Sequence, residues 1–337
     1  MYQEIVQWYQ HNKRDLVFRN YSDPYAIWVS EIMAQQTKIE TMIPYFRQWM
    51  KQFPSIESCA SAAEIDVLKA WEGLGYYRRA KLLHKGCIFV MENYSGTFPN
   101  GYNDILKIPG IGEYTAAAIY SIVFNGKKAA IDGNVIRIVS RINEIESDST
   151  NIATKRTITN IVELWMNECE KCDFSDFTQG LMEIGALICT PKKPKCFECP
   201  LQEYCSALYN ETQLEYPVKP QKKISPIIEY DVLIIEKNNL LLVSEDWSDG
   251  LMSGLTRLPQ INRSSLNEFD VKEEIGKLTH VFSHKKWRLT IFVASIKANY
   301  ILPVTWHWMD SSEIKSSPFV TAHKKILENY YDSAFIK

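Results

Sequence analysis

The sequence lacks an apolar run that approaches the roughly 18 residues needed to cross a membrane. Its beginning, Met1 to Glu4, also lacks the features of a secretory signal peptide. Internal repeats and low-complexity tracts are missing as well. These absences argue against a membrane-spanning, secreted or repetitive protein, so we expect a globular protein of the cell interior with no membrane partner.

A strong excess of one charge is missing too. The chain carries 38 Lys and Arg against 40 Asp and Glu, a formal net charge of −2, and the two signs are mixed along its length. Typical nucleic-acid binders are strongly basic, so any affinity for DNA must come from local clusters. The candidate basic clusters are residues 78–81, 127–128, 192–195 and 285–288.

The chain is long enough for two domains. It has 337 residues, 46% of them hydrophobic. Residues 1–208 show mostly helical patterns, whereas strand patterns dominate residues 227–337. Residues 209–226 between them are polar and punctuated by prolines, which is typical of a linker. In the C-terminal part, Tyr230 to Val243 predicts a hairpin and Trp287 to Ile296 another strand.

The stretch from Leu106 to Asn134 is the most informative part of the helical region. Pro109, Gly110 and Gly112 force a tight turn between a short helix and a longer, alanine-rich helix. The turn offers backbone N–H groups at the start of the second helix, which makes a ready anion site. We therefore expect the backbone at Gly110 and Gly112 to hold a DNA phosphate.

Two carboxylates lie where their chemistry can be tuned. Asp132 directly precedes the apolar stripe of a helix, so it lies near a helix start, where an ionised carboxylate is favoured. Glu31 belongs to a mostly apolar helix that begins at Asp23 and Pro24, and burial would raise its pKa enough for general acid catalysis. Taken singly, Asp132 could be only a helix cap and Glu31 only an exposed helix residue.

The cysteines suggest a metal site. Four of the eight have the spacing C-x6-C-x2-C-x5-C, namely Cys189, Cys196, Cys199 and Cys205. Four closely spaced thiols in an intracellular chain favour a metal over disulfides. On the residues alone, zinc and an iron–sulfur cluster both fit this set. Cys169 and Cys172 have no further ligand pair nearby, so we interpret them as incidental.

Three motifs carry a resemblance to a known family. Ser30 to Thr37 has the form SE-x-M-x-QQT, Trp71 to Ala80 contains GLGYY-x-RA, and Leu106 to Asn134 has the turn and aspartate described above. Together they resemble MutY-type adenine DNA glycosylases, members of the helix-hairpin-helix, endonuclease III-like superfamily. The resemblance implies a mainly α N-terminal glycosylase domain with an iron–sulfur loop and an active-site cleft between two lobes. It also implies an α+β Nudix-like C-terminal domain for lesion recognition.

In that family the two carboxylates are catalytic. The resemblance implies that Glu31 protonates the leaving adenine and that Asp132 stabilises an oxocarbenium-like sugar, while Tyr114 and Asn134 contact this centre. Bifunctional relatives have a lysine at the position of Tyr114, and a phenol cannot form a Schiff base. We therefore predict a monofunctional glycosylase that leaves an abasic site.

The resemblance also places residues around the DNA. The inferred contacts are Arg19 and Glu183 with adenine, Gln36 and Tyr76 within the duplex, Thr37 and Leu74 near the opposing base, and Phe282, Ser283 and His284 with 8-oxoguanine. Two departures from the family fall around the inferred base pocket: Val17-Phe18 in place of Pro-Trp, and Ala34 in place of a larger aliphatic residue. They leave base preference and rate open.

For the metal site, the resemblance favours a 4Fe–4S cluster. Its ligands would be Cys189, Cys196, Cys199 and Cys205, within the loop 189–205. The cluster would have a structural role and present Lys192, Lys193 and Lys195 to the DNA backbone. This gives the basic cluster at residues 192–195 a function that its charge alone does not establish.

The leading prediction is a base excision repair enzyme that flips adenine out of the duplex and hydrolyses its N-glycosidic bond. The adenine would be mispaired with 8-oxoguanine or guanine in double-stranded DNA. The alternatives are a glycosylase for thymine in T:G mismatches or for pyrimidine lesions, and a non-catalytic iron–sulfur DNA-binding protein. Tyr114 opposes the pyrimidine enzyme, and the presence of both carboxylates opposes the non-catalytic protein. We expect a monomer in a prokaryotic cytoplasm, associated with the nucleoid through DNA.

Overall fold

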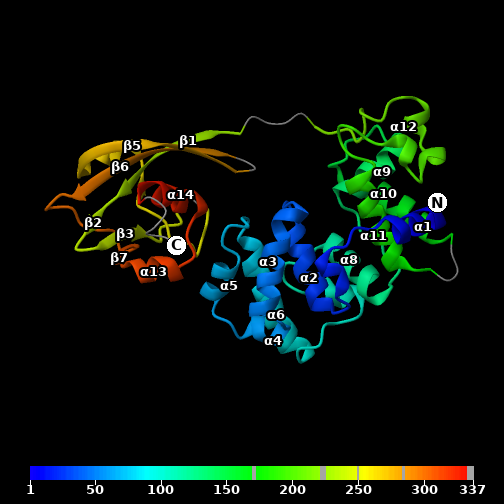
Figure 1. Ribbon diagram of the computed structural model, residues 1–337, viewed down its shortest axis with the longest axis horizontal. Helices are drawn as coiled ribbons and strands as arrows, with labels where there is room; N and C mark the ends of the chain where they lie inside the picture. Colours follow the sequence, from blue (N-terminus) through cyan, green and yellow to red (C-terminus); the bar gives the residue numbers. More distant parts are fainter. Residues whose placement is uncertain (169–171, 221–224, 249, 283–284, 332–337) are drawn as a thin grey trace. The chain divides into compact units, whose positions relative to one another are not determined.

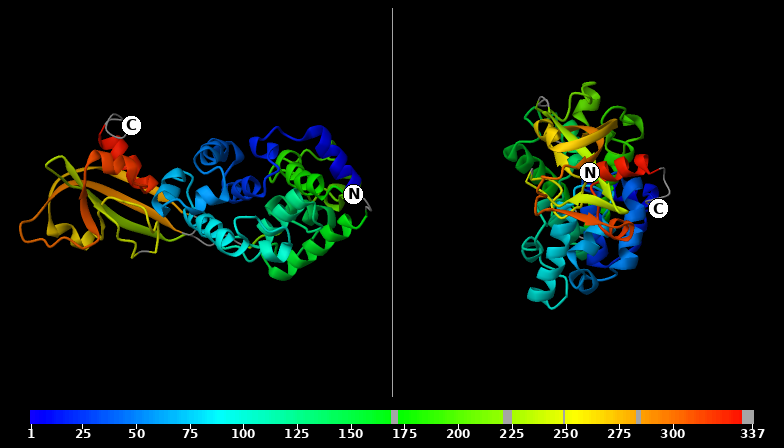
Figure 2. Two further views of the ribbon diagram at one scale, coloured as in Figure 1. Left: turned by 90° about the horizontal axis from the view of Figure 1, so that it is seen from below. Right: turned by 90° about the vertical axis from the view of Figure 1, so that its left-hand side faces the viewer.

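The chain forms two compact units. The computed structural model describes all residues except 169–171, 221–224, 249, 283–284 and 332–337. Unit 1 comprises Met1–Ser61 and Leu82–Lys222, and unit 2 comprises Ala62–Lys81 and Lys223–Lys337. Unit 1 consists of helices, and unit 2 contains the sheets (Figures 1 and 2).

Unit 1 is built from helices joined by short turns. The α-helices are α1 (Tyr2–Asn12), α2 (Pro24–Ala34), α3 (Ile39–Gln52), α4 (Ile56–Ala60), α6 (Arg78–Tyr94, which begins in unit 2), α7 (Tyr102–Ile105), α8 (Glu113–Phe124), α9 (Gly133–Asn143), α10 (Ile152–Met166), α11 (Phe174–Leu187) and α12 (Ser206–Tyr209). Short 3-10 helices occur at η1 (Val17–Asn20), η2 (Cys196–Glu198) and η3 (Gln202–Tyr204). The described residues of unit 1 contain no strand, and the predicted mainly α N-terminal domain is confirmed.

Two groups of buried side chains form the lobes of unit 1. One group includes Ile5 of α1, Val139 of α9 and Trp165 of α10. The other includes Tyr25 of α2 and Trp49 of α3, whose indole Nε1 donates to the Tyr25 hydroxyl at 2.9 Å. Helix α1 packs against α11, so the chain begins in the first lobe, builds the second and returns (Figure 1).

Local sequence explains where the site-bearing helices begin. Asp23 accepts a hydrogen bond from the backbone N–H of Tyr25, and Pro24 opens α2 with a fixed φ. Gly110 has a φ of 84°, and a Cβ there would lie 2.7 Å from Cβ of Leu82, so both conformation and space require glycine. Gly112 has a φ of −95° and open space around it, so neither demand applies there.

Unit 2 contains two sheets, three complete α-helices and one 3-10 helix in its described part. Its elements are α5 (Glu64–Ala70), β1 (Ile227–Ile234), β2 (Glu236–Lys237), β3 (Leu240–Ser244), β4 (Gln260–Ile261), η4 (Arg263–Glu268), β5 (Phe269–Val281), β6 (Lys286–Ile296), β7 (Trp306–Met309), α13 (Ser311–Ser316) and α14 (Thr321–Tyr330). One sheet has the order β4-β1-β6-β5 and the other β2-β3-β7. Leu233, Leu242, Phe292 and Trp306 belong to one core that both sheets share. This mixture of sheet and helix is the predicted α+β arrangement.

The hairpin predicted for Tyr230 to Val243 is only partly correct. The turn is present, because β2 and β3 pair in antiparallel register around Asn238 and Asn239, whose φ angles are 52° and 63°. Two successive positive φ angles are typical of a tight hairpin turn. Strand β1, however, pairs with β6 and β4 in the other sheet. The apolar run through Ile234 and Ile235 hides this change of sheet, because its pattern continues unbroken.

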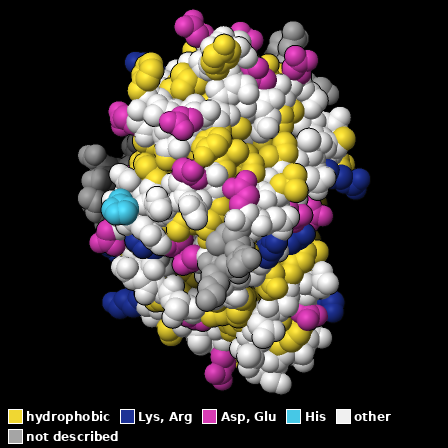
Figure 3. Space-filling view, turned by 90° about the vertical axis from the view of Figure 1, so that its right-hand side faces the viewer, with side chains coloured by type: hydrophobic (Ala, Val, Ile, Leu, Met, Phe, Trp, Pro, Cys, Tyr) yellow, Lys and Arg dark blue, Asp and Glu magenta, His cyan; other side chains and the backbone are white. Residues whose placement is uncertain are grey.

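The surface agrees with the mixed charge of the sequence. On the face drawn in Figure 3, Lys and Arg side chains lie singly among scattered Asp and Glu side chains. Nothing on that face resembles a broad positive patch. Among the described residues, we find no helix that combines the length and the apolar character needed to cross a bilayer.

Candidate active site

A cleft in unit 1 gathers all four residues predicted to be catalytic. Its volume is about 850 Å³. The predicted site residues that line it are Arg19, Glu31, Gln36, Thr37, Gly112, Tyr114, Asp132, Asn134 and Glu183. They come from the segment before α2, the end of α2, the turn between α2 and α3, the starts of α8 and α9, and α11. Phe18 and Ala34, the two departures from the family pattern, line the same cleft.

Glu31 lies in the last turn of α2 with its carboxyl group turned into this cleft. Burial raises the pKa of Glu31 to about 7, and the nearby charge of Asp132 acts in the same direction. The hydroxyl of Tyr114 donates to Glu31 Oε2 at 2.7 Å and opposes the rise, because it stabilises the anion. Glu31 is thus poised to hold and release a proton near neutral pH.

Asp132 is the N-cap of α9. Its Oδ1 accepts hydrogen bonds from the backbone N–H groups of Asn134 and Val135, both at 2.8 Å. The side-chain amide of Asn134 donates to Oδ2 at 2.7 Å. Burial raises the pKa of Asp132, whereas these three donors and the start of α9 favour the anion. The carboxylate is therefore fixed in orientation and surrounded by groups that stabilise its charge.

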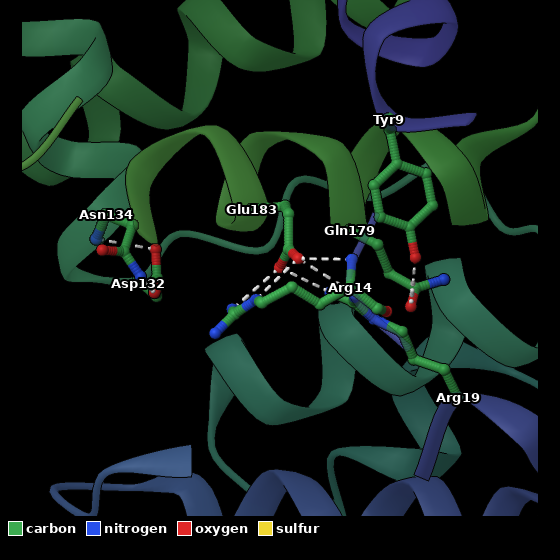
Figure 4. Close-up of polar contacts among 7 residues, drawn as sticks. All are labelled: Tyr9, Arg14, Arg19, Asp132, Asn134, Gln179 and Glu183. Carbon is green, nitrogen blue, oxygen red and sulfur yellow. Dashed lines mark hydrogen bonds and ion pairs between the residues drawn. The ribbon is translucent and has the colours of Figure 1, made fainter. Parts of the chain in front are cut away.

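Glu183 of α11 is the centre of an ion-pair cluster. Figure 4 shows two arginines converging on its carboxylate. Arg14 donates through its backbone N–H, Nε and Nη2 at 3.0, 2.8 and 3.0 Å, and Arg19 through Nη1 and Nη2 at 3.2 and 2.8 Å. These cations hold the pKa of Glu183 at about 2, although burial acts against them. Glu183 is only 1% exposed and remains an anion.

Arg14 is a site residue that the sequence reasoning missed. It contributes three of the hydrogen bonds to Glu183, more than Arg19 does. It also lines the cleft. The available signal was its position five residues before Arg19 in the same basic segment. Spacing alone could not show that both side chains meet one glutamate from a distant helix.

A second residue missed from the sequence, Arg137, supports Asn134. Its Nη2 donates to Asn134 Oδ1 at 2.9 Å and to the carbonyl of Gly185 at 2.7 Å. Its Nε donates to the carbonyl of Cys189 at 2.6 Å. A Cβ on Gly185 would lie 2.4 Å from Cβ of Asn134, so glycine lets α11 approach α9 closely. The orientation of Asn134 is thereby fixed by groups other than Asp132 as well.

Two residues predicted to enter the duplex share an unusual backbone. Gln36, at the rim of the cleft, has a φ of 56°, and Tyr76, in unit 2, has a φ of 50°. L side chains rarely adopt this region, and such strain concentrates at functional sites. Tyr76 is 48% exposed, as an inserting ring must be. Leu74, predicted near the opposing base, is buried with 6% exposure.

The proposed lesion loop is only partly described. Ser283 and His284 lie outside the described residues. Phe282 closes the turn between β5 and β6, since its N–H donates to the carbonyl of Lys285 at 2.8 Å. Its ring packs edge-on against Trp287, with the ring centroids 4.7 Å apart. Phe282 is therefore anchored at the base of the loop.

The four cysteines of the predicted cluster surround one small, nearly apolar cavity. Its volume is about 30 Å³, and Arg141 also lines it, donating to Sγ of Cys189 at 3.3 Å. Four cysteine thiolates around one site are the ligand set of a 4Fe–4S cluster. Cys189, Cys196, Cys199 and Cys205 therefore fit a 4Fe–4S cluster.

The predicted phosphate-binding groups are accessible. Lys192, Lys193 and Lys195 are exposed on the cysteine loop, and Lys195 pairs with Glu198 at 3.4 Å. At the other element, Gly112 is the N-cap of α8 and provides no side chain to bond the first N–H groups. The start of α8 therefore has no capping side chain, and anion binding there stays a prediction.

Comparison with known families divides the chain into three parts. Residues 29–164 match the family described as HhH-GPD superfamily base excision DNA repair proteins. Residues 189–205 match the iron–sulfur binding domain of endonuclease III, and residues 232–329 match the NUDIX domain. The predicted helix-hairpin-helix fold, iron–sulfur loop and Nudix-like domain are thereby confirmed, and the protein carries a 4Fe–4S cluster.

Solved structures and curated relatives agree with this division. A thermostable thymine-DNA glycosylase superposes with a TM-score of 0.56 at 26% identity, covering 62% of this chain and 94% of that chain. An endonuclease III–DNA complex, with a TM-score of 0.52 and 18% identity over 63% of this chain and 94% of that chain, shows the same fold. Adenine DNA glycosylase of Mus musculus is 28% identical, covering 97% of this chain and 77% of the relative. That of Buchnera aphidicola subsp. Baizongia pistaciae is 33% identical, covering 88% of this chain and 85% of the relative. The chain belongs to the family of adenine DNA glycosylases.

Proposed function

We propose that this chain is a monofunctional glycosylase that hydrolyses the N-glycosidic bond of adenine mispaired with 8-oxoguanine or guanine in DNA. The observation that carries the proposal is the Tyr114–Glu31 hydrogen bond of 2.7 Å beside Asp132. Glu31, whose pKa burial raises to about 7, and Asp132 line the same cleft. Glycosidic cleavage requires such a pair, in which one carboxyl group can donate a proton and the other stays ionised.

The reaction begins with the flipped adenine in the cleft. Glu31 gives its proton to N7 of the base, so that the C1′–N9 bond breaks and adenine leaves as a neutral molecule with the bonding electron pair. The sugar becomes an oxocarbenium ion, which the fixed Asp132 carboxylate stabilises. Glu31 then accepts a proton from the water that attacks C1′. Asn134 and Tyr114 hold the two carboxyl groups in position.

The same geometry supports chemistry without strand cleavage. Tyr114 stands at the start of α8 where bifunctional relatives have a lysine, and its phenol binds Glu31 rather than the sugar. Among the described residues that line the cleft, Lys38 is the one lysine, and it is exposed at the rim. An abasic site is therefore the expected product.

The arginine cluster offers a means of base recognition. Glu183 accepts five hydrogen bonds from Arg14 and Arg19, and a carboxylate has about four lone-pair sites. In this arrangement the arginine N–H groups are the ones that can reach acceptor nitrogens of adenine, with Glu183 holding them. A base that leaves these buried donors unpaired is rejected more strongly than an apolar pocket could reject it.

The remaining parts provide the grip on DNA. The backbone at Gly110 and Gly112 and the lysines of the cysteine loop bind phosphates, and the cluster holds that loop in shape. Gln36, Thr37, Leu74 and Tyr76 contact the duplex around the flipped base. Residues 227–337, reached through a linker at 209–226, read 8-oxoguanine with Phe282, Ser283 and His284. The protein works as a monomer in a prokaryotic cytoplasm.

The test is single-turnover base release from matched duplexes that carry 8-oxoguanine:A, G:A or G:T. We expect rapid adenine loss opposite 8-oxoguanine, slower loss opposite guanine, and strand breaks only after alkali. Release of thymine would instead mean that Phe18 and Ala34 have remade the pocket. No release from any duplex, with the cluster intact and DNA bound, would leave only a DNA-binding role. Direct strand breaks that disappear in Lys38→Ala would assign lyase chemistry to that residue.

A further inference from the structure

In the turn between α5 and α6, Tyr76 has a backbone conformation that contacts with neighbouring groups must stabilise. The residue has a positive φ of 50° although it is not glycine, and its ring is 48% exposed. An exposed aromatic ring on a strained backbone loses little favourable free energy when it relaxes to another conformation. Neighbouring groups must therefore supply contacts that keep it in place.

Arg79, in the first turn of α6, supplies such contacts. Its guanidinium carbon lies 5.4 Å from the centroid of the Tyr76 ring and 5.2 Å from that of the Trp71 ring, over both. Its Nη2 donates to the carbonyl of Gly75 at 3.1 Å. The buried Trp71 donates from Nε1 to the same carbonyl at 3.0 Å. One side chain thus touches the wedge ring and also fixes the peptide that precedes it.

The other basic residues of cluster 78–81 are placed differently. Arg78 is exposed, and Lys81 pairs with Glu64 at 2.7 Å. Arg79 is partly buried, and burial lowers its pKa to about 10, which still leaves it charged at neutral pH. A planar cation placed over two rings gains cation–π energy that grows with desolvation. The three charges therefore do not form one uniform phosphate-binding patch.

We infer that Arg79 is a positioning residue that holds the Tyr76 ring and the Gly75 carbonyl in the conformation that enters the duplex. The inference rests on the proposed entry of Tyr76 into DNA. Because the ring is already ordered, less conformational entropy is lost when it inserts into the duplex. A planar guanidinium can stack and donate at the same time, which the ammonium of lysine cannot do equally well.

The experiment compares Arg79→Lys, Arg79→Met and Tyr76→Ala in the full-length protein. Each variant is measured on a duplex with 2-aminopurine beside an 8-oxoguanine:A pair. The readouts are the fluorescence rise on binding, the single-turnover rate at saturating protein, and the dissociation constant between 50 and 200 mM salt. We expect Arg79→Lys to lower the saturating rate and the fluorescence rise by about 5- to 30-fold, the range between an exposed and a desolvated cation–π contact. Its salt dependence should match that of the unchanged protein.

Two further variants make the result specific. Lys193→Gln removes a proposed phosphate ligand and calibrates the salt slope, which should change by about 0.9 for each phosphate that is no longer neutralised. Lys85→Gln removes an exposed charge farther along α6 and should alter neither readout. The double variant Arg79→Lys/Tyr76→Ala should be no slower than Tyr76→Ala alone, because both changes remove one interaction. Thermal unfolding of each variant shows whether the fold is kept.

The outcomes separate the inference from the function on which it rests. A slow Tyr76→Ala with an unaffected Arg79→Lys would overturn the inference alone. A salt slope that falls by about 0.9 in Arg79→Met, with normal fluorescence, would make Arg79 a phosphate ligand and overturn it too. A fully active Tyr76→Ala would overturn the proposed wedge and the inference together.

Discussion

Two glutamates in the same cleft are held in opposite states. Glu31, on α2, has its pKa raised to about 7, whereas Glu183, on α11, has its pKa lowered to about 2. Burial acts on both in the same direction, so it cannot explain the difference. The partners explain it. Glu31 receives one hydrogen bond from a neutral phenol, and Glu183 receives five from two guanidinium side chains and a backbone N–H.

The comparison shows how one cleft can provide both a proton and a fixed charge. A buried carboxyl group with a neutral partner keeps a proton that it can give to a leaving base. A buried carboxylate between two cations stays ionised and holds those cations in a defined geometry. The protein therefore assigns acid and anchor roles through neighbours, with the same side chain in both places.

The largest effect should follow from removing the acid. Glu31→Gln keeps the shape and can still accept from Tyr114, but it has no proton of suitable acidity to donate. We expect single-turnover adenine release to fall by about 10³-fold or more, since general acid catalysis contributes about 10²–10⁴. Gel-shift affinity for the 8-oxoguanine:A duplex should change by less than about threefold. A rate within tenfold of the unchanged protein would remove Glu31 from the role of acid.

A smaller but still large effect should follow from removing the anchor. Glu183→Gln leaves two arginines without their counter-charge. Breaking a fully buried pair costs about 3–5 kcal/mol, and we expect about 2–3 kcal/mol here. The reduction reflects the partial exposure of Arg14 and Arg19, whose side chains are 31% and 13% exposed. Urea unfolding would measure the loss.

The matched control for the anchor is Arg14→Lys. Lysine keeps one positive charge near Glu183 but loses the forked pair of donors, so its cost should lie between those of the unchanged protein and Glu183→Gln. Both variants should also lose discrimination between adenine and other bases, measured as the ratio of release rates. Equal stability in all three proteins would show that the cluster contributes nothing to the fold.

The sequence predicted some of these residues well and others not at all. Glu31, Asp132 and Tyr114 belong to local motifs, so they can be found from the chain itself, and the cap at Asp132 follows from the helix pattern behind it. Arg14 and Arg137 act on residues from distant helices, Glu183 and Gly185. Contacts between residues that are far apart in the sequence cannot be predicted from local spacing.

The same limit applies to the fold. The turn at Gly110 and the start of α2 follow from glycine and proline, whose backbone preferences are intrinsic. The move from β1 to a second sheet does not, because Ile234 and Ile235 are apolar on both sides of the break. Sheet membership depends on partners that come later in the chain, here β6 and β7.

The smallest effect sharpens the comparison most, because the two glutamates should give stability opposite dependences on pH. Glu31 has a folded pKa of about 7, above its usual 4.5, so its contribution is fully present below 4.5 and is lost as pH rises through 7. Glu183 has a folded pKa of about 2, so its contribution is present above 4.5 and is lost only as pH falls through 2.

Between pH 5 and 8 the loss of stability in Glu183→Gln should therefore stay constant. Over the same range Glu31→Gln should gain about 1–2 kcal/mol on the unchanged protein, which is less than 1.36 kcal/mol for each unit of the pKa shift because the side chain is only partly buried where it lines the cleft. Urea unfolding at pH 5, 6.5 and 8 measures both, and a flat difference for Glu31→Gln would mean that its pKa is not raised.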